Sequence, residues 1–263
     1  MSKRMKDLFE EARAAGRKLF IPYVTAGYPT RTDSVPILLA CEAGGADLIE
    51  LGMPFTDPLA DGATIQHANQ IALEAGITLQ GCFDIVRDAR AQGLKAPVVF
   101  MGYYNPLLAR GEERAVAEAK AAGEDGFIIV DLPAEEAAGF LRICRANDMS
   151  LVPLVAPTST DARIETLAKT ADSWIYCVSV TGTTGGKSID SVDLEGFVAR
   201  VRRHTTLPLA VGFGVNTRQQ ADRVRKVADA VAVGSAIIAT IDAADVNRRA
   251  DRVREFVEDV SGR

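Results

Sequence analysis

Short apolar runs alternate with longer amphipathic segments from one end of the chain to the other. The runs are rich in Val, Ile, Leu and aromatic residues, and most end at or just before Gly, Pro, Asp or Thr. Continuous apolar runs of this kind are typical of strands that are buried on both faces of a parallel sheet. Eight runs predict strands, at residues 19–27, 47–54, 97–104, 125–133, 151–157, 173–180, 207–214 and 229–236.

The segments between these runs are rich in Ala, Leu, Glu and Arg, and they carry the periodicity of helices with one apolar face. The longest interval separates the second run from the third, and it holds two such segments, at residues 65–76 and 80–93. One more helix is predicted before the first strand, where the residues that share a face are Met5, Leu8, Phe9 and Ala12.

Eight strands that alternate with helices predict an α/β fold, a single (β/α)8 TIM barrel. The prediction includes an extra N-terminal helix and an added helix after the second strand. It treats residues 1–263 as one catalytic domain, because no linker composition interrupts them. An open, doubly wound sheet stays the alternative. That fold normally shows a GxGxxG turn after its first strand, whereas residues 27–32 read GYPTRT.

Composition and charge narrow the class of function. Hydrophobic residues make up 48% of the chain and charged residues 25%, which is ordinary for a globular protein with a large core. The net charge of −5 argues against nucleic acid or an anionic membrane as partner, because both bind basic surfaces. No apolar run is long enough to cross a bilayer, the N-terminus lacks the apolar core of a signal peptide, and the four cysteines form no CxxC pair. We therefore expect a cytoplasmic protein with reduced thiols.

Glycines mark the ends of the last two predicted strands. Residues 212–214 read Gly-Phe-Gly, and Gly234-Ser235 precedes a short apolar segment that is expected to form a helix. In barrels, the loops after strands seven and eight often bind phosphate through backbone amides, together with a short extra helix. The glycine-rich stretch 181–190 is a third candidate element for this site. The alternative is that these glycines only form tight turns.

Glu50 is the residue that most needs an explanation. It lies inside an apolar run, and a buried carboxylate is costly unless it is paired or used chemically. The loop that follows carries Asp57 and Asp61, and it leaves the carboxyl end of the strand, where barrels build active sites. We favour an acid/base role for Glu50 over a buried ion pair. Asp61 is expected to stay ionised in a wetter loop, and Asp57 is interpreted as a turn residue.

Three further side chains are candidates: Asp131 and Tyr103 at the ends of predicted strands, and Tyr176 inside the strand predicted at 173–180. Asp131, Tyr103 and Tyr176 are expected to converge with Glu50 at one mouth of the barrel. Each also has a simpler interpretation, since Asp131 can bind amides of the following loop and a tyrosine can fill the barrel with a satisfied hydroxyl. The sequence shows only two histidines, no metal-ligand spacing and no lysine inside a predicted strand. We therefore expect no metal and no Schiff-base chemistry.

Longer motifs connect these positions to a known family. LIELGMPFTDPLADG at residues 48–62 strongly resembles the signature of the tryptophan synthase alpha chain family. Other matching motifs follow in order along nearly the whole chain. They are FIPYVTAGYP at 20–29, TIQ at 64–66, MGYYNP at 101–106, IIVDLP at 128–133, VAPTST at 155–160, VSVTGTTG at 178–185, and VGFGV and VGSAI within 211–237.

The resemblance implies a (β/α)8 barrel that cleaves indole-3-glycerol phosphate to indole and glyceraldehyde 3-phosphate, with no cofactor of its own. It also implies a partner, the pyridoxal-phosphate-dependent tryptophan synthase beta chain, in an α2β2 complex for L-tryptophan biosynthesis. The loops 54–61 and 181–190 correspond to elements that the family uses against the beta chain. By motif position, the catalytic residues are Glu50, Asp61 and Tyr176, the indole pocket holds Tyr23, Met101, Tyr103 and Ile128, and the phosphate site holds Gly185, Phe213, Gly214, Gly234 and Ser235.

A few positions depart from the family pattern. Tyr23 stands where Phe is common, and Ala63 stands where Pro usually follows Asp61-Gly62. These changes bear on the pocket and on loop stiffness rather than on the chemistry. Three other functions stay open: a stand-alone indole-releasing lyase, a catalytically weak allosteric subunit of a beta chain, and an unrelated phosphosugar isomerase on the same barrel.

Overall fold

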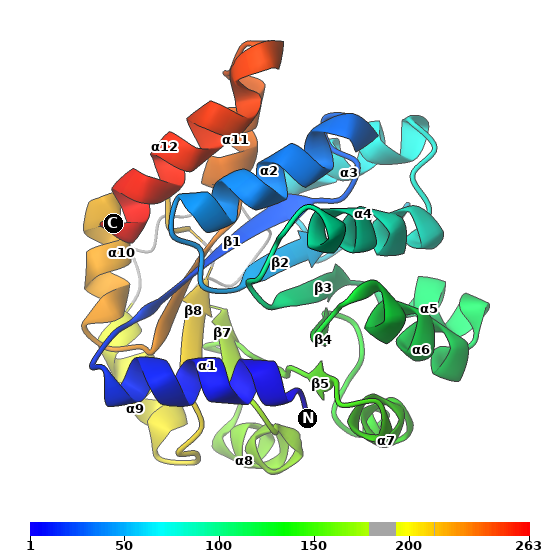
Figure 1. The fold of residues 1–263 in the computed structure, drawn as a ribbon. Coiled ribbons are helices and arrows are strands. Elements are labelled where there is room, and N and C mark those ends of the chain that lie inside the picture. Colours follow the sequence, from blue (N-terminus) through cyan, green and yellow to red (C-terminus); the bar gives the residue numbers. More distant parts are fainter. Residues whose placement is uncertain (179–192, 213) are drawn as a thin grey trace.

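Each predicted apolar run forms strand structure, and helices join the strands in sequence (Figure 1). The computed structural model describes residues 1–178, 193–212 and 214–263. Its strands are β1 (Leu19–Thr25), β2 (Ile49–Gly52), β3 (Val98–Gly102), β4 (Gly126–Ile129), β5 (Ser150–Leu151), β6 (Leu154–Val155), β7 (Ile175–Val178), β8 (Leu209–Gly212) and β9 (Ala230–Val233). Its helices are α1 (Lys3–Ala14), α2 (Arg31–Ala43), α3 (Ala63–Glu74), α4 (Leu79–Ala91), α5 (Tyr104–Arg110), α6 (Glu112–Ala122), α7 (Ala138–Ala146), α8 (Asp161–Thr170), α9 (Leu194–Arg202), α10 (Arg218–Arg225), α11 (Ser235–Asp242), η2 (Val246–Arg248) and α12 (Arg249–Ser261).

The strands form one parallel sheet that closes on itself. Its order is β5-β4-β3-β2-β1-β9-β8-β7-β6, so the two strands at its ends, β5 and β6, are consecutive in the chain. The helices lie around the outside, with α12 packed along α2 (Figure 1). The predicted barrel is therefore confirmed, and the open, doubly wound alternative is excluded.

One predicted strand is divided in two. The run at 151–157 forms β5 and β6, which are separated by Val152 and Pro153. The Val152 amide donates to the Phe127 carbonyl of β4 (2.8 Å), and the Pro153 carbonyl accepts from the Tyr176 amide of β7 (3.0 Å). Proline has no amide hydrogen, so the regular ladder is interrupted at this point. The segment still bridges β4 and β7, and this bridge closes the barrel.

The helices confirm most of the predicted pattern. Helix α1 precedes β1, and both α3 and α4 lie between β2 and β3, as expected. Helix α5 was not predicted, because its start was assigned to the end of the preceding strand. The amide of Tyr104, its first residue, donates to Asp131 Oδ1 (2.8 Å), so a carboxylate 27 residues away caps this helix. Within the described residues, no helix combines the length and the apolar character that a membrane span requires.

The strands separate an interior core from an outer core. Leu19, Ile21 and Tyr23 belong to a cluster inside the barrel, whereas Phe20 and Val24 pack under the helices. This alternation follows from the two-residue period of a strand. The same alternation holds at β2, because Leu48, just before the strand, belongs to the interior cluster and Ile49 and Leu51 belong to the outer one. The side chain of Glu50 therefore points into the barrel.

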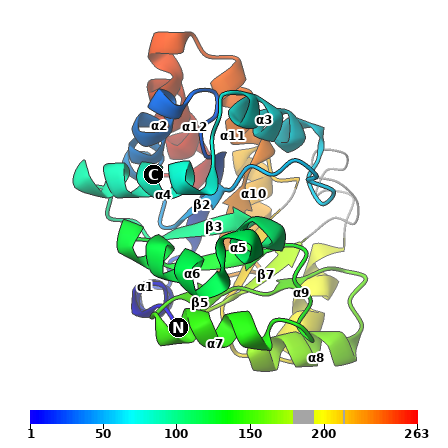
Figure 2. The ribbon, with the colours of Figure 1, turned by 90° about the vertical axis from the view of Figure 1, so that its right-hand side faces the viewer.

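Helix α1 covers the end of the barrel where the strands begin. The Met5 side chain lies against Gly126 at the start of β4, and the Phe9 ring lies 5.9 Å from the ring of Trp174, just before β7. The loop to α3 leaves the opposite, carboxyl end of β2. Figure 2 shows α1 and α3 on opposite sides of the strands.

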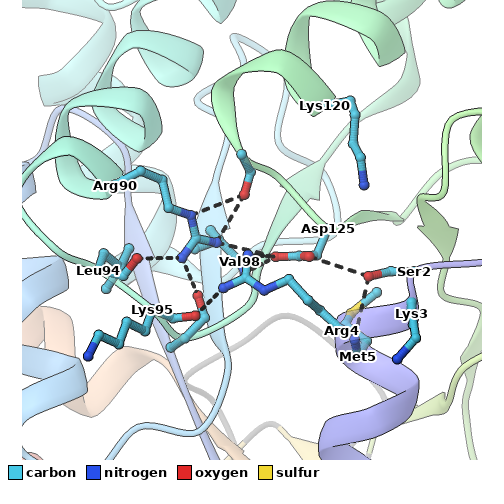
Figure 3. A network of polar contacts seen from close by, with 12 residues as sticks. Ser2, Lys3, Arg4, Met5, Arg90, Leu94, Lys95, Val98, Lys120 and Asp125 are labelled. Atoms are coloured by element: carbon cyan, nitrogen blue, oxygen red, sulfur yellow. Dashed lines mark hydrogen bonds and ion pairs between the residues drawn. The ribbon is translucent and has the colours of Figure 1, made fainter.

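A polar network joins α1 to the barrel (Figure 3). Asp125, at the entrance to β4, accepts hydrogen bonds from the Ser2 hydroxyl (3.3 Å), from Arg4 (3.2 Å) and from Arg90 of α4 (3.2 Å). It also accepts from the Val98 amide at the start of β3 (3.0 Å). One buried carboxylate thus connects two helices and two strands at the end of the barrel where stability residues are typical.

Candidate active site

A pocket lies at the carboxyl ends of the strands, at the opposite end from α1. Most of the predicted site residues take part in it, and they come from β1, β2, β3, β7 and the loops after β2, β8 and β9. The described residues that line it are Tyr23, Glu50, Asp61, Ile65, Met101, Tyr176, Gly214, Val215, Ala232, Gly234 and Ser235. Gly185 and Phe213, and the 181–190 loop, lie outside the described residues.

Glu50 is an isolated carboxyl group inside the barrel. Its exposed fraction is 1%, and its Oε1 atom accepts no hydrogen bond from the described part of the chain. Burial alone raises the pKa of Glu50 well above its ordinary value. The described residues provide no cation for the buried ion pair that was the alternative. Burial therefore favours the protonated form of this carboxyl group, and a buried carboxyl group that lines a pocket is placed to exchange a proton with a bound molecule.

Asp61 lies in the same pocket but in a different setting. Its Oδ2 atom accepts hydrogen bonds from the Tyr103 hydroxyl (3.3 Å) and from the Asn69 side-chain amide (3.3 Å). Burial raises the pKa of Asp61 to about 6, and these two hydrogen bonds oppose the rise. Asp61 is only partly buried, whereas Glu50 is 1% exposed, so the loop is the wetter of the two settings, as expected. Burial is still the largest influence on the pKa of this carboxyl group. A pKa of about 6 lies below 7, so Asp61 is still mostly ionised at neutral pH, as the sequence led us to expect.

The loop that carries Asp61 is held from two sides. The Gln66 side chain of α3 donates to the Asp61 carbonyl (2.8 Å), and the Tyr103 hydroxyl accepts from the Ala60 amide (2.9 Å). The Tyr103 ring also stacks on Phe55, with ring centres 5.1 Å apart. Tyr103 therefore fixes the loop as well as filling space. Asp57 accepts from the Thr56 hydroxyl (2.6 Å) and, through its carbonyl, from the Leu59 amide (2.9 Å), as a turn residue does.

Two tyrosines of the pocket lie against glycines of neighbouring strands. A Cβ atom on Gly52 would lie 2.1 Å from the hydroxyl of Tyr23, and one on Gly212 would lie 2.0 Å from the hydroxyl of Tyr176. Both positions must therefore be glycine if the tyrosine rings are to keep their places. The Tyr23 hydroxyl lies 3.3 Å from Thr25 Oγ1, and burial raises the pKa of Tyr23 above its ordinary value.

Met101 and Ile128 differ in whether they line the pocket. They are paired neighbours on β3 and β4 and belong to the same interior cluster. Met101 lines the pocket, whereas Ile128 is not among the described residues that line it. Its predicted role in indole binding stays a prediction.

The loops after β8 and β9 contribute Gly214, Gly234 and Ser235 to the pocket, and this part is called the backbone wall. Gly214 has a φ of +75°, which favours glycine, and Gly234 is the N-cap of α11. The Ile237 amide donates to the Gly234 carbonyl (2.8 Å) in the first hydrogen bond of the helix. The amides of Ser235 and Ala236 come before it, so they have no acceptor within the helix. Amides at a helix N-terminus, with its partial positive charge, suit an anion such as phosphate.

Sequence reasoning missed Asn69. Its exposed fraction is 2%, and it shares the buried face of α3 with Ile65, Ala68 and Ala72. An asparagine among apolar residues of one helix face is a visible signal, because a buried amide needs partners. Within the described residues, no group of histidine, cysteine, aspartate and glutamate could hold a metal ion.

Comparisons with known proteins identify the family. The family model described as tryptophan synthase alpha chain matches residues 9–261. The chain is 45% identical to the tryptophan synthase alpha chain of Roseiflexus sp. (strain RS-1), over 98% of this chain and 99% of that one. It is 47% identical to tryptophan synthase of Saccharomyces cerevisiae, over 99% of this chain but only 37% of that longer protein.

Solved structures give the same result. The crystal structure of tryptophan synthase subunit alpha from Legionella pneumophila str. Paris superposes with a TM-score of 0.91 at 31% identity, covering 100% of this chain and 98% of that one. A structure of the tryptophan synthase α2β2 complex from Pyrococcus furiosus contains a chain that matches with a TM-score of 0.83 at 35% identity, covering 94% and 98%. The chain described here belongs to the tryptophan synthase alpha chain family.

Proposed function

We propose that this pocket cleaves indole-3-glycerol phosphate to indole and glyceraldehyde 3-phosphate, with the whole chain, residues 1–263, acting as one catalytic domain. As a member of its family, the chain is a lyase of tryptophan biosynthesis. The observation that carries the residue assignment is the isolation of Glu50, a buried carboxyl group with no described partner, in one pocket with a hydrogen-bonded Asp61.

The proposed chemistry needs a group that both gives and takes a proton. Indole leaves poorly until its C3 atom is protonated, and the bond from C3 to the glycerol chain then breaks as the side-chain hydroxyl loses its proton. Glu50 gives one proton to C3 and takes one from the hydroxyl, so it ends the cycle as it began. Burial, which raises the pKa of Glu50, supports this role near neutral pH.

Asp61 has the complementary task in this proposal. Protonation at C3 leaves positive charge on the indole ring nitrogen, and an ionised carboxylate stabilises it. A pKa of about 6 keeps Asp61 ionised at neutral pH. Tyr176, which lines the pocket on β7, orients the reacting groups. Tyr23, Met101, Tyr103 and Ile128 enclose the indole ring.

The phosphate group of the substrate is assigned to the backbone wall. Gly214, Gly234 and Ser235 line the pocket, and the first amides of α11 lie beside them. Gly185 and Phe213 keep their predicted phosphate role. An anchor of this kind holds the reactive carbon near Glu50 and supplies orientation rather than chemistry.

A beta chain is the proposed partner, in an α2β2 complex like that named for the Pyrococcus furiosus relative. The proposed contact surface includes the 54–61 loop, where Leu59 is 85% exposed. A large exposed apolar side chain on a loop beside the active site suits an interface. The proposed compartment is the cytoplasm, which fits four buried cysteines that are all free thiols.

The decisive experiment measures indole release from indole-3-glycerol phosphate by the full chain. We expect Glu50→Gln to lose about 100-fold to 10,000-fold in kcat, because it removes the general acid/base while keeping the shape of the side chain. Glu124→Gln is the matched control: Glu124 is also buried, 1% exposed, but lies between α6 and β4 and does not line the pocket. Near-normal activity of Glu50→Gln would remove Glu50 from the mechanism.

The same assay separates the alternative functions. Full indole release without a beta chain indicates a stand-alone lyase, and release that rises on adding one indicates the proposed subunit. A chain that binds and stimulates a beta chain but releases no indole is an allosteric subunit. Turnover of a phosphosugar with no cleavage of indole-3-glycerol phosphate indicates the isomerase.

A further inference from the structure

Both side-chain donors to Asp61 reach the same oxygen atom. The Tyr103 hydroxyl and the Asn69 amide each lie 3.3 Å from Oδ2, and they come from different elements, the end of β3 and the middle of α3. No described residue donates a side-chain hydrogen bond to Oδ1. The carboxylate is thus held by one oxygen, which leaves the other for the pocket that Asp61 lines.

The direction of these hydrogen bonds follows from the chemistry of the groups. An ionised carboxylate only accepts, so Asn69 must present its NH2 group to Asp61. The Tyr103 hydroxyl already accepts from the Ala60 amide, so its own proton is available for Asp61. The Oδ1 atom of Asn69 is buried and accepts no hydrogen bond from the described residues. Leaving a buried amide oxygen without a hydrogen bond costs free energy. That cost is explained if the NH2 group of the same side chain is needed to hold Asp61.

We propose that Asn69 is a positioning residue for the lyase reaction, and that together with Tyr103 it clamps Asp61 Oδ2 so that Oδ1 faces the ring nitrogen of the substrate. This inference rests on the proposed function and adds a residue to it. Asn69 touches no substrate and acts through the carboxylate alone. Ile65, one turn earlier on the same face of α3, lines the pocket itself.

The clamp also keeps Asp61 charged. Hydrogen bonds to an ionised carboxylate favour the ionised form, and the two donors hold the pKa of Asp61 at about 6 against burial. The other titratable groups around Asp61 are Tyr103 beyond β3, Tyr23 on β1 and Glu50 on β2. Tyr176 on β7 lines the same pocket. On α3 itself, His67 occupies an exposed position, two residues from Asn69.

The test is the pH dependence of kcat/KM for indole release by the full chain, from about pH 5 to 9. The acid limb reports the group that must be ionised in the free enzyme. We expect Asn69→Leu to move this limb upward by about one pH unit, because a hydrogen bond to a charged group is lost. Asn69→Asp moves it further, since a second carboxylate beside Asp61 opposes its ionisation.

The matched control is Gln70→Leu. Gln70 is the next residue on α3, exposed, and its amide donates to Glu74 rather than to the pocket. We expect its profile to coincide with that of the parent chain. Tyr103→Phe removes the second donor to the same oxygen, so it should shift the acid limb in the same direction as Asn69→Leu. This second variant keeps the proposal testable if Asn69→Leu folds poorly.

A carbon-13 NMR titration of the Asp61 carboxyl group in the same variants separates two kinds of failure. If the parent chain releases no indole, the proposed function fails. If it does, but neither the acid limb nor the carboxyl titration moves in Asn69→Leu and Tyr103→Phe, the positioning role is wrong and the proposed function stands. A uniform loss of kcat at every pH in Asn69→Leu would also overturn the proposal, because it would mark a residue that only supports packing.

Discussion

Two carboxyl groups share one pocket and differ in what surrounds them. Glu50 is 1% exposed and has no described hydrogen-bond donor, whereas Asp61 has two side-chain donors on one oxygen. Environments that separate the pKa values of two neighbouring groups assign one as the acid and the other as the charged stabiliser. Both residues lie within one short sequence motif. In the barrel the Glu50 side chain points inward from β2, whereas Asp61 lies in the loop that follows this strand.

Substitution of Gly52 tests how closely β2 packs against the Tyr23 side chain. We expect Gly52→Ala to lower the free energy of unfolding by about 1–3 kcal/mol, because the new methyl group overlaps the Tyr23 ring. Urea denaturation measures the change. Gly139→Ala in α7 is the control, since a Cβ atom there meets no atom within 4 Å, and we expect a gain of about 0.5–1 kcal/mol.

A second substitution locates the overlap at the hydroxyl group. Tyr23→Phe removes the atom that lies closest to the new Cβ, so Gly52→Ala should cost less in that background than in the parent chain. Equal costs in both backgrounds would show that the Tyr23 hydroxyl does not decide the packing at this position.

Single residues differ in how far the sequence could identify them. Glu50 was predicted because a charge within an apolar run is visible from its immediate neighbours. The clamp on Asp61 was not, because Tyr103 lies 42 positions away and its contact depends on the path of the loop. For the same reason the sequence did not indicate how far burial raises the pKa of Asp61, since local composition shows a polar loop and not the side chains that cover it.

At the scale of elements, the pattern of apolar runs was sufficient to predict the barrel. It was insufficient where a distant group decides the local structure. Helix α5 begins at Tyr104 because Asp131 caps its first amide from the end of the next strand. The run at 151–157 is divided because Pro153 lacks an amide, although the segment still binds strands on both sides. The first error lies at an element boundary that a distant carboxylate decides, and the second lies inside a run, at a proline whose apolar side chain hides the missing amide.

The turn between α6 and β4 contains a carboxyl group that the proposed mechanism does not use. Both oxygens of Glu124 are buried and have no partner among the described residues, and burial, followed by the charge of Asp125, raises the pKa of Glu124 well above its ordinary value. The folded state therefore holds a proton that the unfolded chain releases above about pH 4.5. Stability then falls as the pH rises through this range, because the folded state binds more protons.

Substitution of Glu124 should remove this pH dependence. We expect Glu124→Gln to match the parent chain near pH 4 and to become more stable above pH 5, with a difference that widens by up to about 1.4 kcal/mol per pH unit until the folded carboxyl ionises. Urea denaturation at pH 4 to 8 measures it. Parallel curves for the two proteins at all pH values would show that Glu124 titrates alike in both states.

On the scale of the whole molecule, the two ends of the barrel have separate tasks. The end where the strands begin is closed by α1 and by the network around Asp125 (Figures 2 and 3). The other end carries the pocket. The interior cluster between them runs from Met5 and Phe9 to Tyr23 and Tyr176. In barrels generally, residues at the first end support stability and residues at the second support catalysis.

Two substitutions at opposite ends test this division. Met5→Ala removes a fully buried side chain from α1, and we expect it to lower the free energy of unfolding by about 2–5 kcal/mol while the kcat of the folded enzyme stays unchanged. Asp61→Asn removes the charge that stabilises the substrate cation, so kcat should fall at least about tenfold with stability changed by less than about 1 kcal/mol. Denaturation curves and indole release, measured on the same preparations, give both quantities. A large loss of kcat in Met5→Ala at full folding would show that α1 and the pocket are coupled through the interior cluster.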